Sequence, residues 1–279
     1  MRFLALCKPG LAGLAAAAAA AGYLVVAPHR PAGAIWAGLG VLLLAAGAST
    51  LNQYQDREID RRMDRTRDRP IPSGLVRPEL ALAFSALLLG AGLIVLSRGG
   101  TRPALLGALA AAWYNGVYTP LKRTSPMAVV PGSLSGALAP AVGAAFAGAR
   151  WDYPPVLLLA LLLFIWQIPH FWLIALDRVR EFREAGLPNL LDVLPEAQAR
   201  RVVVHWVLGT AAASLVVAGW GTFLFPATRW AVLALSLWLA GRALRFRASP
   251  FRLERSLFRT MNIHMALLLL AIALDGLFL

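Results

Sequence analysis

GAIWAGLGVLLLAAGASTLNQYQDREIDRRMDRTRDRPIPSG, residues 33–74, contains the change from apolar to charged sequence that decides the fold. Its first half is apolar over roughly the 20 residues that a helix needs to cross a bilayer. Its second half begins at Asn52 and places Asp56, Asp60 and Asp64 at intervals of four residues. On a helix this spacing stacks all four side chains on one face, so we expect a charged stripe at the end of a membrane span.

Three carboxylates on one helical stripe repel one another, so the stripe is a poor device for stability alone. A divalent cation that bridges them to a phosphate-bearing ligand would remove this conflict, and Mg²⁺ is commonly bound by a few protein oxygens and substrate phosphates. The pattern therefore indicates a metal site that includes Asn52, Asp56 and Asp60. The alternative is a solvated helix whose acids pair with arginines four residues away, and the charge pattern alone favours neither interpretation.

The composition of the whole chain is that of a membrane protein. Of its 279 residues, 59% are hydrophobic and 15% are charged, whereas soluble domains carry about a quarter charged residues. Because open sheets cannot satisfy their backbone in lipid, we predict an all-α polytopic protein, a bundle of about nine transmembrane helices with cytoplasmic helical caps. The expected spans are residues 9–28, 33–54, 79–97, 102–119, 126–147, 154–176, 202–224, 227–244 and 257–279.

The net charge of +13 does not indicate nucleic-acid binding, because the basic residues lie in short loops between the apolar segments. With the amino terminus inside, five of the 27 Lys and Arg residues fall on the outer side, and this bias predicts a multi-pass protein of the cell membrane. Its amino terminus and acidic segments would be cytoplasmic, and its carboxyl terminus would lie on the opposite side. The five outer residues are Arg30, Arg98, Arg102, Arg150 and Arg229.

A second acidic segment, DRVREFREAGLPNL, follows the sixth expected span. Its Asp177 and Glu181 are again four residues apart, and two such segments on one side of the membrane suggest two halves of a diphosphate clamp. A third cytoplasmic loop contains Lys122 and Arg123, whose charges could stabilise a departing diphosphate. Taken alone, these two cations fit ordinary positive-inside anchoring equally well.

Residues 52–74 resemble the first aspartate-rich signature of the UbiA-type intramembrane prenyltransferases, and their continuation resembles the protohaem IX farnesyltransferase (haem O synthase) branch. The similarity extends in order over nearly the whole chain. The family usually has Asp-Tyr where this chain has Glu181-Phe182, and Met-Leu-Pro at residues 189–191. Further matches to the branch are Lys8-Pro9, Tyr118-Thr119, Leu121-Lys122-Arg123, Trp166-Gln167-Ile168-Pro169-His170-Phe171 and Ala185-Gly186-Leu187-Pro188.

The resemblance implies one UbiA-type domain over residues 1–279, which transfers a farnesyl group from farnesyl diphosphate to a vinyl group of haem B. Water is added, and the products are haem O and diphosphate. It also implies Mg²⁺ as cofactor, the lipid bilayer as surroundings, no nucleic-acid partner, and haem-processing or terminal oxidase assembly partners. Two alternatives stay open: a UbiA-type enzyme that prenylates a quinone precursor or another aromatic acceptor, and a haem-binding or transport scaffold without catalysis.

The resemblance also implies roles for individual residues. Asn52, Asp56, Asp60 and Lys122 would be catalytic, and Asp177 or Glu181 would complete the metal site from across the cavity. His170 lies at the end of a span, where ionisable residues are functional candidates, and it could ligate haem iron or orient a propionate. The residues expected to bind the diphosphate of the substrate are Arg65, Arg69, Lys122 and Arg123.

Overall fold

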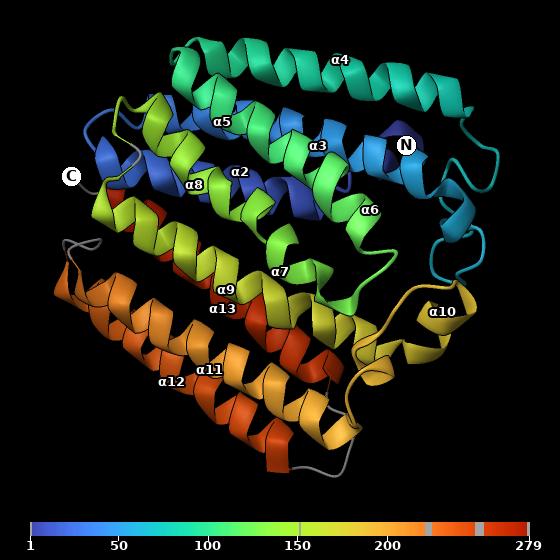
Figure 1. Cartoon of the computed structure of the whole chain (residues 1–279). Helices are drawn as coiled ribbons and strands as arrows, with labels where there is room; N and C mark the ends of the chain where they lie inside the picture. The colour runs from blue at the N-terminus through green and yellow to red at the C-terminus, as the bar shows by residue number, and fades with distance from the viewer. Residues whose placement is uncertain (1, 151, 221–224, 249–253, 278–279) are drawn as a thin grey trace.

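The chain forms a bundle of helices (Figure 1). The computed structural model describes residues 2–150, 152–220, 225–248 and 254–277, and every element of this part is helical, which confirms the all-α prediction. The long helices are α2 (Pro9–Val26), α3 (Ala32–Asp60), α4 (Pro78–Ser97), α9 (Pro154–Asp177), α11 (Glu196–Gly219), α12 (Pro226–Ala248) and α13 (Glu254–Leu277).

Shorter helices complete the bundle and its loops. Helix α1 (Arg2–Leu6) precedes α2. The fourth expected span consists of α5 (Thr101–Ala112), a π-helical turn (Trp113–Tyr118) and α6 (Thr119–Leu121). A 3₁₀ turn (Pro126–Ala128) and α7 (Val129–Gly132) then lead into α8 (Leu134–Phe146). The loop after α9 contains α10 (Val179–Glu184) and a 3₁₀ turn (Leu190–Asp192).

Each of the nine expected spans coincides with helical sequence, although two ends, residues 221–224 and 278–279, lie outside the described residues. Seven described segments are long and apolar enough to cross a membrane, so the chain is a multi-span membrane protein and the count of nine is approximate. The two expected spans outside that set are the interrupted α5–α6 segment and α12, which carries several arginines.

The arrangement of the helices brings the charged segments together. In Figure 1, α4 lies at one edge of the bundle and the α11–α12 pair at the other, with α2, α3, α8, α9 and α13 between them. The amino terminus, the end of α3 and α10 lie at one end of the bundle, and the carboxyl terminus lies at the opposite end. The two acidic segments therefore share one end, as the four expected spans between them predict.

The predicted four-residue stripe is correct for three members and wrong for Asp64. Helix α3 ends at Asp60, and Asp64 lies in the following turns, exposed and paired with Arg67 at 3.0 Å. The buried Thr66 explains this end, because its hydroxyl donates to the backbone carbonyl of Asp60 at 2.9 Å. That bond folds the chain back over the end of the helix and moves Asp64 off the stripe.

Helices α2 and α8 approach each other at glycines. A Cβ on Gly143 would lie 1.8 Å from the carbonyl oxygen of Ala19, and one on Gly22 would lie 2.2 Å from that of Pro140. Both obstacles are backbone atoms, which cannot rotate away. Small residues at helix crossings permit this close approach in membranes, where packing is the main attraction between helices.

Gly143→Ala should therefore lower the midpoint of thermal unfolding, because overpacking of a close contact costs about 1–3 kcal/mol. Gly90→Ala in α4 is the matched control, since a Cβ at that position has no neighbour within 4 Å. It should leave the midpoint unchanged or raise it slightly. Equal unfolding midpoints for Gly143→Ala and the unaltered protein in detergent would show that α2 and α8 are far enough apart at Gly143 to accommodate a methyl group.

Candidate active site

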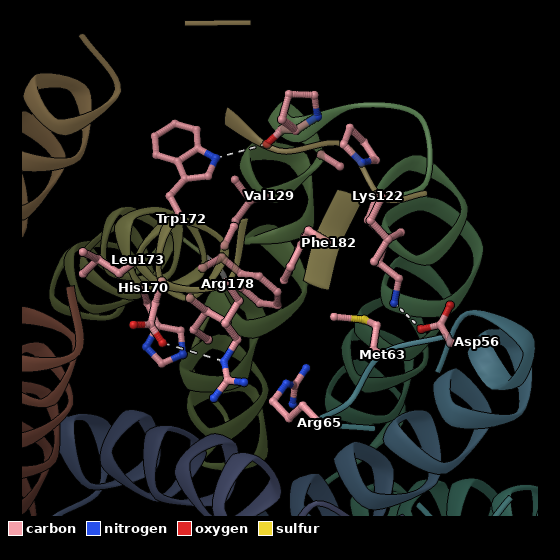
Figure 2. Close-up of a pocket in the computed structure, with 18 of the residues that line it drawn as sticks. Asp56, Met63, Arg65, Lys122, Val129, His170, Trp172, Leu173, Arg178 and Phe182 are labelled. Carbon is pink, nitrogen blue, oxygen red and sulfur yellow. Dashed lines mark hydrogen bonds and ion pairs between the residues drawn. The ribbon is translucent and has the colours of Figure 1, made fainter. Parts of the chain in front are cut away.

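A cavity of about 640 Å³ opens at the end of the bundle that carries the acidic segments. Its walls come from α3, from the π-helical turn, from α9 and from α13. Figure 2 shows Asp56 and Lys122 on one side and His170 and Leu173 on the other. Seven cationic and three acidic side chains line it, so it carries a positive excess: Lys8, Arg65, Arg69, Lys122, Arg178, Arg255 and Arg259 against Asp56, Asp60 and Asp177.

The first acidic segment lies buried in the cavity wall, on three successive turns of α3. Asn52 is 2% exposed, and Asp56 and Asp60 are each 5% exposed. The Asn52 amide donates to Asp56 Oδ2 at 2.8 Å and to Thr119 Oγ1 at 3.0 Å, while its Oδ1 accepts from Lys8 Nζ at 3.0 Å. The network fixes the orientation of the amide and aligns one amide and two carboxylates along a single face.

The carboxylates of this segment are held by the cations that the sequence predicts for diphosphate binding. Lys122 Nζ donates to Asp56 Oδ2, and Arg123 Nη2 lies 3.1 Å from Asp56 Oδ1. Arg69 Nη1 contacts both oxygens of Asp60, at 2.9 and 2.8 Å. Predicted metal ligands and predicted phosphate ligands are therefore in direct contact.

The cations around the cavity repel one another and are costly to bury. Burial, which has the largest effect, and the neighbouring charges of Arg69 and Lys122 together lower the pKa of Lys8 to about 7. Burial also lowers the pKa of Lys122, against the opposing attraction of Asp56. Arg65 makes no ion pair within the described chain, and burial, Arg69 and Arg178 all lower its pKa. An anion bound here would relieve this repulsion.

The second acidic segment is only partly at the cavity. Helix α9 ends at Asp177, and Arg178 departs from helical geometry before α10, so the four-residue spacing does not stack Glu181 over Asp177. Asp177 lines the cavity and accepts from Arg255 Nε at 2.9 Å. Glu181 Oε1 accepts from Arg178 at 3.0 Å, whereas its Oε2 is buried without a hydrogen bond. An unsatisfied carboxylate oxygen is a candidate ligand for a cation.

His170 lies on α9 in an aromatic setting across the cavity from Asp56 (Figure 2). Its ring centroid is 4.7 Å from that of Trp166 and 4.6 Å from that of Phe258, and its Nδ1 is buried without a partner. Asn262 of α13 lines the same apolar cavity as this imidazole. The contacts with α13 were not predicted, although Arg255, Phe258, Arg259 and Asn262 recur in the sequence at intervals of one helical turn, a signal that could have revealed a lining face.

Residues 10–268 match the UbiA prenyltransferase family. The chain belongs to this family. It is 40% identical to the protoheme IX farnesyltransferase of Geobacter sulfurreducens, over 97% of this chain and 98% of that protein. It is 33% identical to the protoheme IX farnesyltransferase of Oleidesulfovibrio alaskensis, over 96% of this chain and 93% of the relative.

Solved structures share the fold of this UbiA-family protein at low sequence identity. A structure of digeranylgeranylglyceryl phosphate synthase superposes with a TM-score of 0.79 at 17% identity, and it covers 100% of this chain and 98% of its own. A UbiA homologue from Archaeoglobus fulgidus bound to GPP and Mg²⁺ has a TM-score of 0.73 at 17% identity, with both chains fully covered. The UbiA-type fold is thereby confirmed.

A second, apolar cavity of about 540 Å³ continues from the first toward the interior of this UbiA-family bundle. The two share Tyr114, Tyr118, His170 and Phe171 among their lining residues. The inner cavity is lined mainly by small and aliphatic side chains, such as Ala18 of α2. A polar, cationic mouth above an apolar interior suits a ligand with an anionic head and a hydrocarbon tail.

The donors at the mouth of this UbiA-family site fit Mg²⁺ in chemistry and in number. Mg²⁺ in phosphate-transfer sites is bound by one or two carboxylates and by substrate phosphates, with water in the remaining positions. Asp56 and Asp60 supply two carboxylates on one face, and Asn52 supplies an amide oxygen. Over the described ranges, no three His, Cys, Asp or Glu side chains are grouped closely enough to hold a metal by themselves.

Proposed function

We propose that this protein transfers the farnesyl group of farnesyl diphosphate to a vinyl group of haem B, with addition of water, to give haem O and diphosphate. The observation that carries the choice of acceptor is the 40% identity to a protoheme IX farnesyltransferase over nearly both chains. The choice of donor has independent support from the paired cavities, whose cationic mouth and apolar interior suit a prenyl diphosphate.

In this proposal, the diphosphate head occupies the mouth. Its oxygens accept hydrogen bonds from Lys122, Arg123, Arg65 and Arg69. All of these except Arg65 exchange part of their contact with the α3 carboxylates for contact with the diphosphate. Asn52, Asp56 and Asp60 would hold Mg²⁺, with Asp177 or the unsatisfied Oε2 of Glu181 completing the site from the other wall. When bound, Mg²⁺ would neutralise charge on the leaving diphosphate and so favour cleavage of the allylic C–O bond.

The acceptor would lie beside His170, where the mouth meets the apolar cavity. The π electrons of the vinyl group form a bond to C1 of the farnesyl chain as the C–O electron pair leaves with the diphosphate. Water then adds to the vinyl carbon next to the porphyrin and loses a proton. Tyr118 and Phe171 narrow this region, with ring centroids 5.6 Å apart, and help to exclude bulk water before the new C–C bond has formed.

The charge distribution supports a cytoplasmic mouth. The order of the expected spans assigns five of the 27 Lys and Arg residues to the side opposite the acidic segments, and such a bias places the more basic side in the cytoplasm. We therefore assign the amino terminus and both acidic segments to the cytoplasmic face. Farnesyl diphosphate would then reach the site with its head in water and its chain in the bilayer.

A competition between acceptors tests this function. Purified protein in detergent receives labelled farnesyl diphosphate and Mg²⁺ together with haem B, a phenolic acid and a naphthoate, and the products are separated by chromatography. The proposal expects the label in a haem product. Label only in the phenolic acid or naphthoate would support a quinone-type enzyme instead, and no transfer to any acceptor would favour a scaffold without catalysis.

The lowered pKa of Lys8 predicts a pH-dependent affinity for the donor. Below about pH 7 the ammonium is protonated and attracts the diphosphate, whereas above it the group becomes neutral and the attraction is lost. The KM for farnesyl diphosphate should therefore rise about fivefold between about pH 6 and pH 8.5. Lys8→Arg is the matched control, since its charge persists over this range and its KM should stay low. Identical pH profiles for the two proteins would exclude Lys8 from diphosphate binding.

A further inference from the structure

One face of α13 lines the two cavities from the mouth inward. Arg255, Phe258 and Arg259 line the mouth, Asn262 lies one turn further along the helix, and Ala266 follows in the apolar cavity. The intervals of three and four residues place all five on one helical face. Along this face the chemistry changes from two guanidinium groups to an aromatic ring, an amide and a small apolar side chain.

The two arginines of this face are separate from the groups that surround the first acidic segment. Arg255 pairs with Asp177, where its side chain is 73% exposed, and Arg259 is exposed and has no carboxylate within ion-pair distance in the described part of the chain. The cations on the other wall, Lys122 and Arg69, pair with the acids of α3. The α13 arginines thus give the mouth a second cationic region.

Flat aromatic surface lies directly beside these arginines. The ring of Phe258 is 4.6 Å from that of His170, which in turn is 4.7 Å from Trp166. Asn262, one turn from Phe258, lines the adjoining cavity together with His170. Aromatic faces contact flat, conjugated molecules well, and cations at the adjacent mouth suit acidic groups at the edge of such a molecule.

We infer that Arg259 and Arg255 bind the two propionates of the porphyrin acceptor, while its macrocycle packs beside Phe258 and His170. This inference rests on the proposed function and adds to it the site and orientation of the acceptor. Propionates at the mouth stay hydrated, which avoids the cost of burying charge. The opposite edge of the porphyrin, which carries the vinyl groups, then points across the cavity toward Asp56 and the reacting end of the farnesyl chain.

The inference is tested with Arg259→Gln and with two acceptors, haem B and its propionate dimethyl ester. Affinity is measured by absorbance titration, and KM for farnesyl diphosphate is measured in parallel. Arg259→Gln should weaken binding of haem B about fivefold, because a charge-assisted hydrogen bond at an exposed mouth is lost. The unaltered protein should lose a larger factor on esterification, because both propionate charges are removed, whereas Arg259→Gln should lose a smaller factor, because only the pairing with Arg255 is left to be lost. Arg259→Lys should recover part of the loss.

Arg247→Gln is the matched control, since Arg247 is an exposed arginine in the last turn of α12 and lines neither cavity. It should leave both affinities unchanged.

The propionate assignment would be overturned if Arg259→Gln lost affinity for haem B and for its ester by equal factors. It would also be overturned if Arg259→Gln changed only the KM for farnesyl diphosphate, by raising it. Either result would leave haem farnesylation intact. A loss that appears only when phosphatidylglycerol is added would assign Arg259 to lipid headgroups and overturn the propionate assignment as well. No binding or turnover of haem B by the unaltered protein would overturn the inference together with the proposed function.

Discussion

Asp56→Asn should lower the rate of prenyl transfer about a thousandfold, and Asp60→Asn should have an effect of similar size. Each removes a buried carboxylate from the only face of α3 that lines the cavity mouth. In the proposed mechanism, that charge holds Mg²⁺ against the leaving diphosphate. It also orients the surrounding cations, since Asp56 contacts Lys122 and Arg123 and Asp60 contacts Arg69. The rate is measured as haem product formed at saturating farnesyl diphosphate and Mg²⁺.

Asp64→Asn is the control within the same segment. Asp64 is exposed, follows the end of α3 and pairs only with Arg67 among the ion pairs of the described residues, so its variant should retain activity within about twofold. Thermal unfolding in detergent separates loss of chemistry from loss of fold. Near-normal transfer by both Asp56→Asn and Asp60→Asn would contradict the metal role of the α3 face.

Lys122→Met should reduce kcat about a hundredfold, with a smaller change in KM for farnesyl diphosphate. The reason is that negative charge on the diphosphate grows as the C–O bond breaks, so a cation at this position stabilises the transition state more than the bound substrate. Burial lowers the pKa of Lys122, and its contact with Asp56 opposes this shift. Single-turnover measurements of product formation report the chemical step directly.

Lys122→Arg keeps the positive charge and should retain activity within about tenfold, because the planar guanidinium reaches different oxygens. Arg150→Gln is a second control, in the connection between α8 and α9, where Arg150 pairs with Asp152 and is largely exposed. An unchanged kcat in Lys122→Met would mean that this lysine only balances the charge of Asp56. In that case another cation of the mouth, such as Arg69, would have to stabilise the leaving group.

The sequence predicted those parts of the structure that depend on local pattern. Apolar segments of bilayer length predicted the helices, and the spacing of Asn52, Asp56 and Asp60 predicted their shared face, because both follow from helical geometry. Asp64 was misplaced because the end of α3 depends on one specific side-chain contact, the hydrogen bond from Thr66 to the carbonyl of Asp60. No period in the sequence reports such a contact.

The contribution of α13 was not predictable for a different reason. Arginine is abundant throughout the loops of this chain, so charge alone did not distinguish Arg255 and Arg259 from residues that anchor the protein at the membrane surface. Their place at the mouth depends on the packing of α13 against α9, which brings Phe258 onto His170. Likewise, the offset between Asp177 and Glu181 depends on the backbone of Arg178, which interrupts the helix.

At the mouth the acceptor is haem B, and water completes the reaction. Mass spectrometry of the product formed from haem B, farnesyl diphosphate and Mg²⁺ in isotopically labelled water tests both parts at once. We expect a haem whose mass has increased by one farnesyl group and one hydroxyl that carries the labelled oxygen. Recovery of unmodified haem B, together with a farnesylated phenolic or naphthoate acceptor when these are supplied, would contradict it.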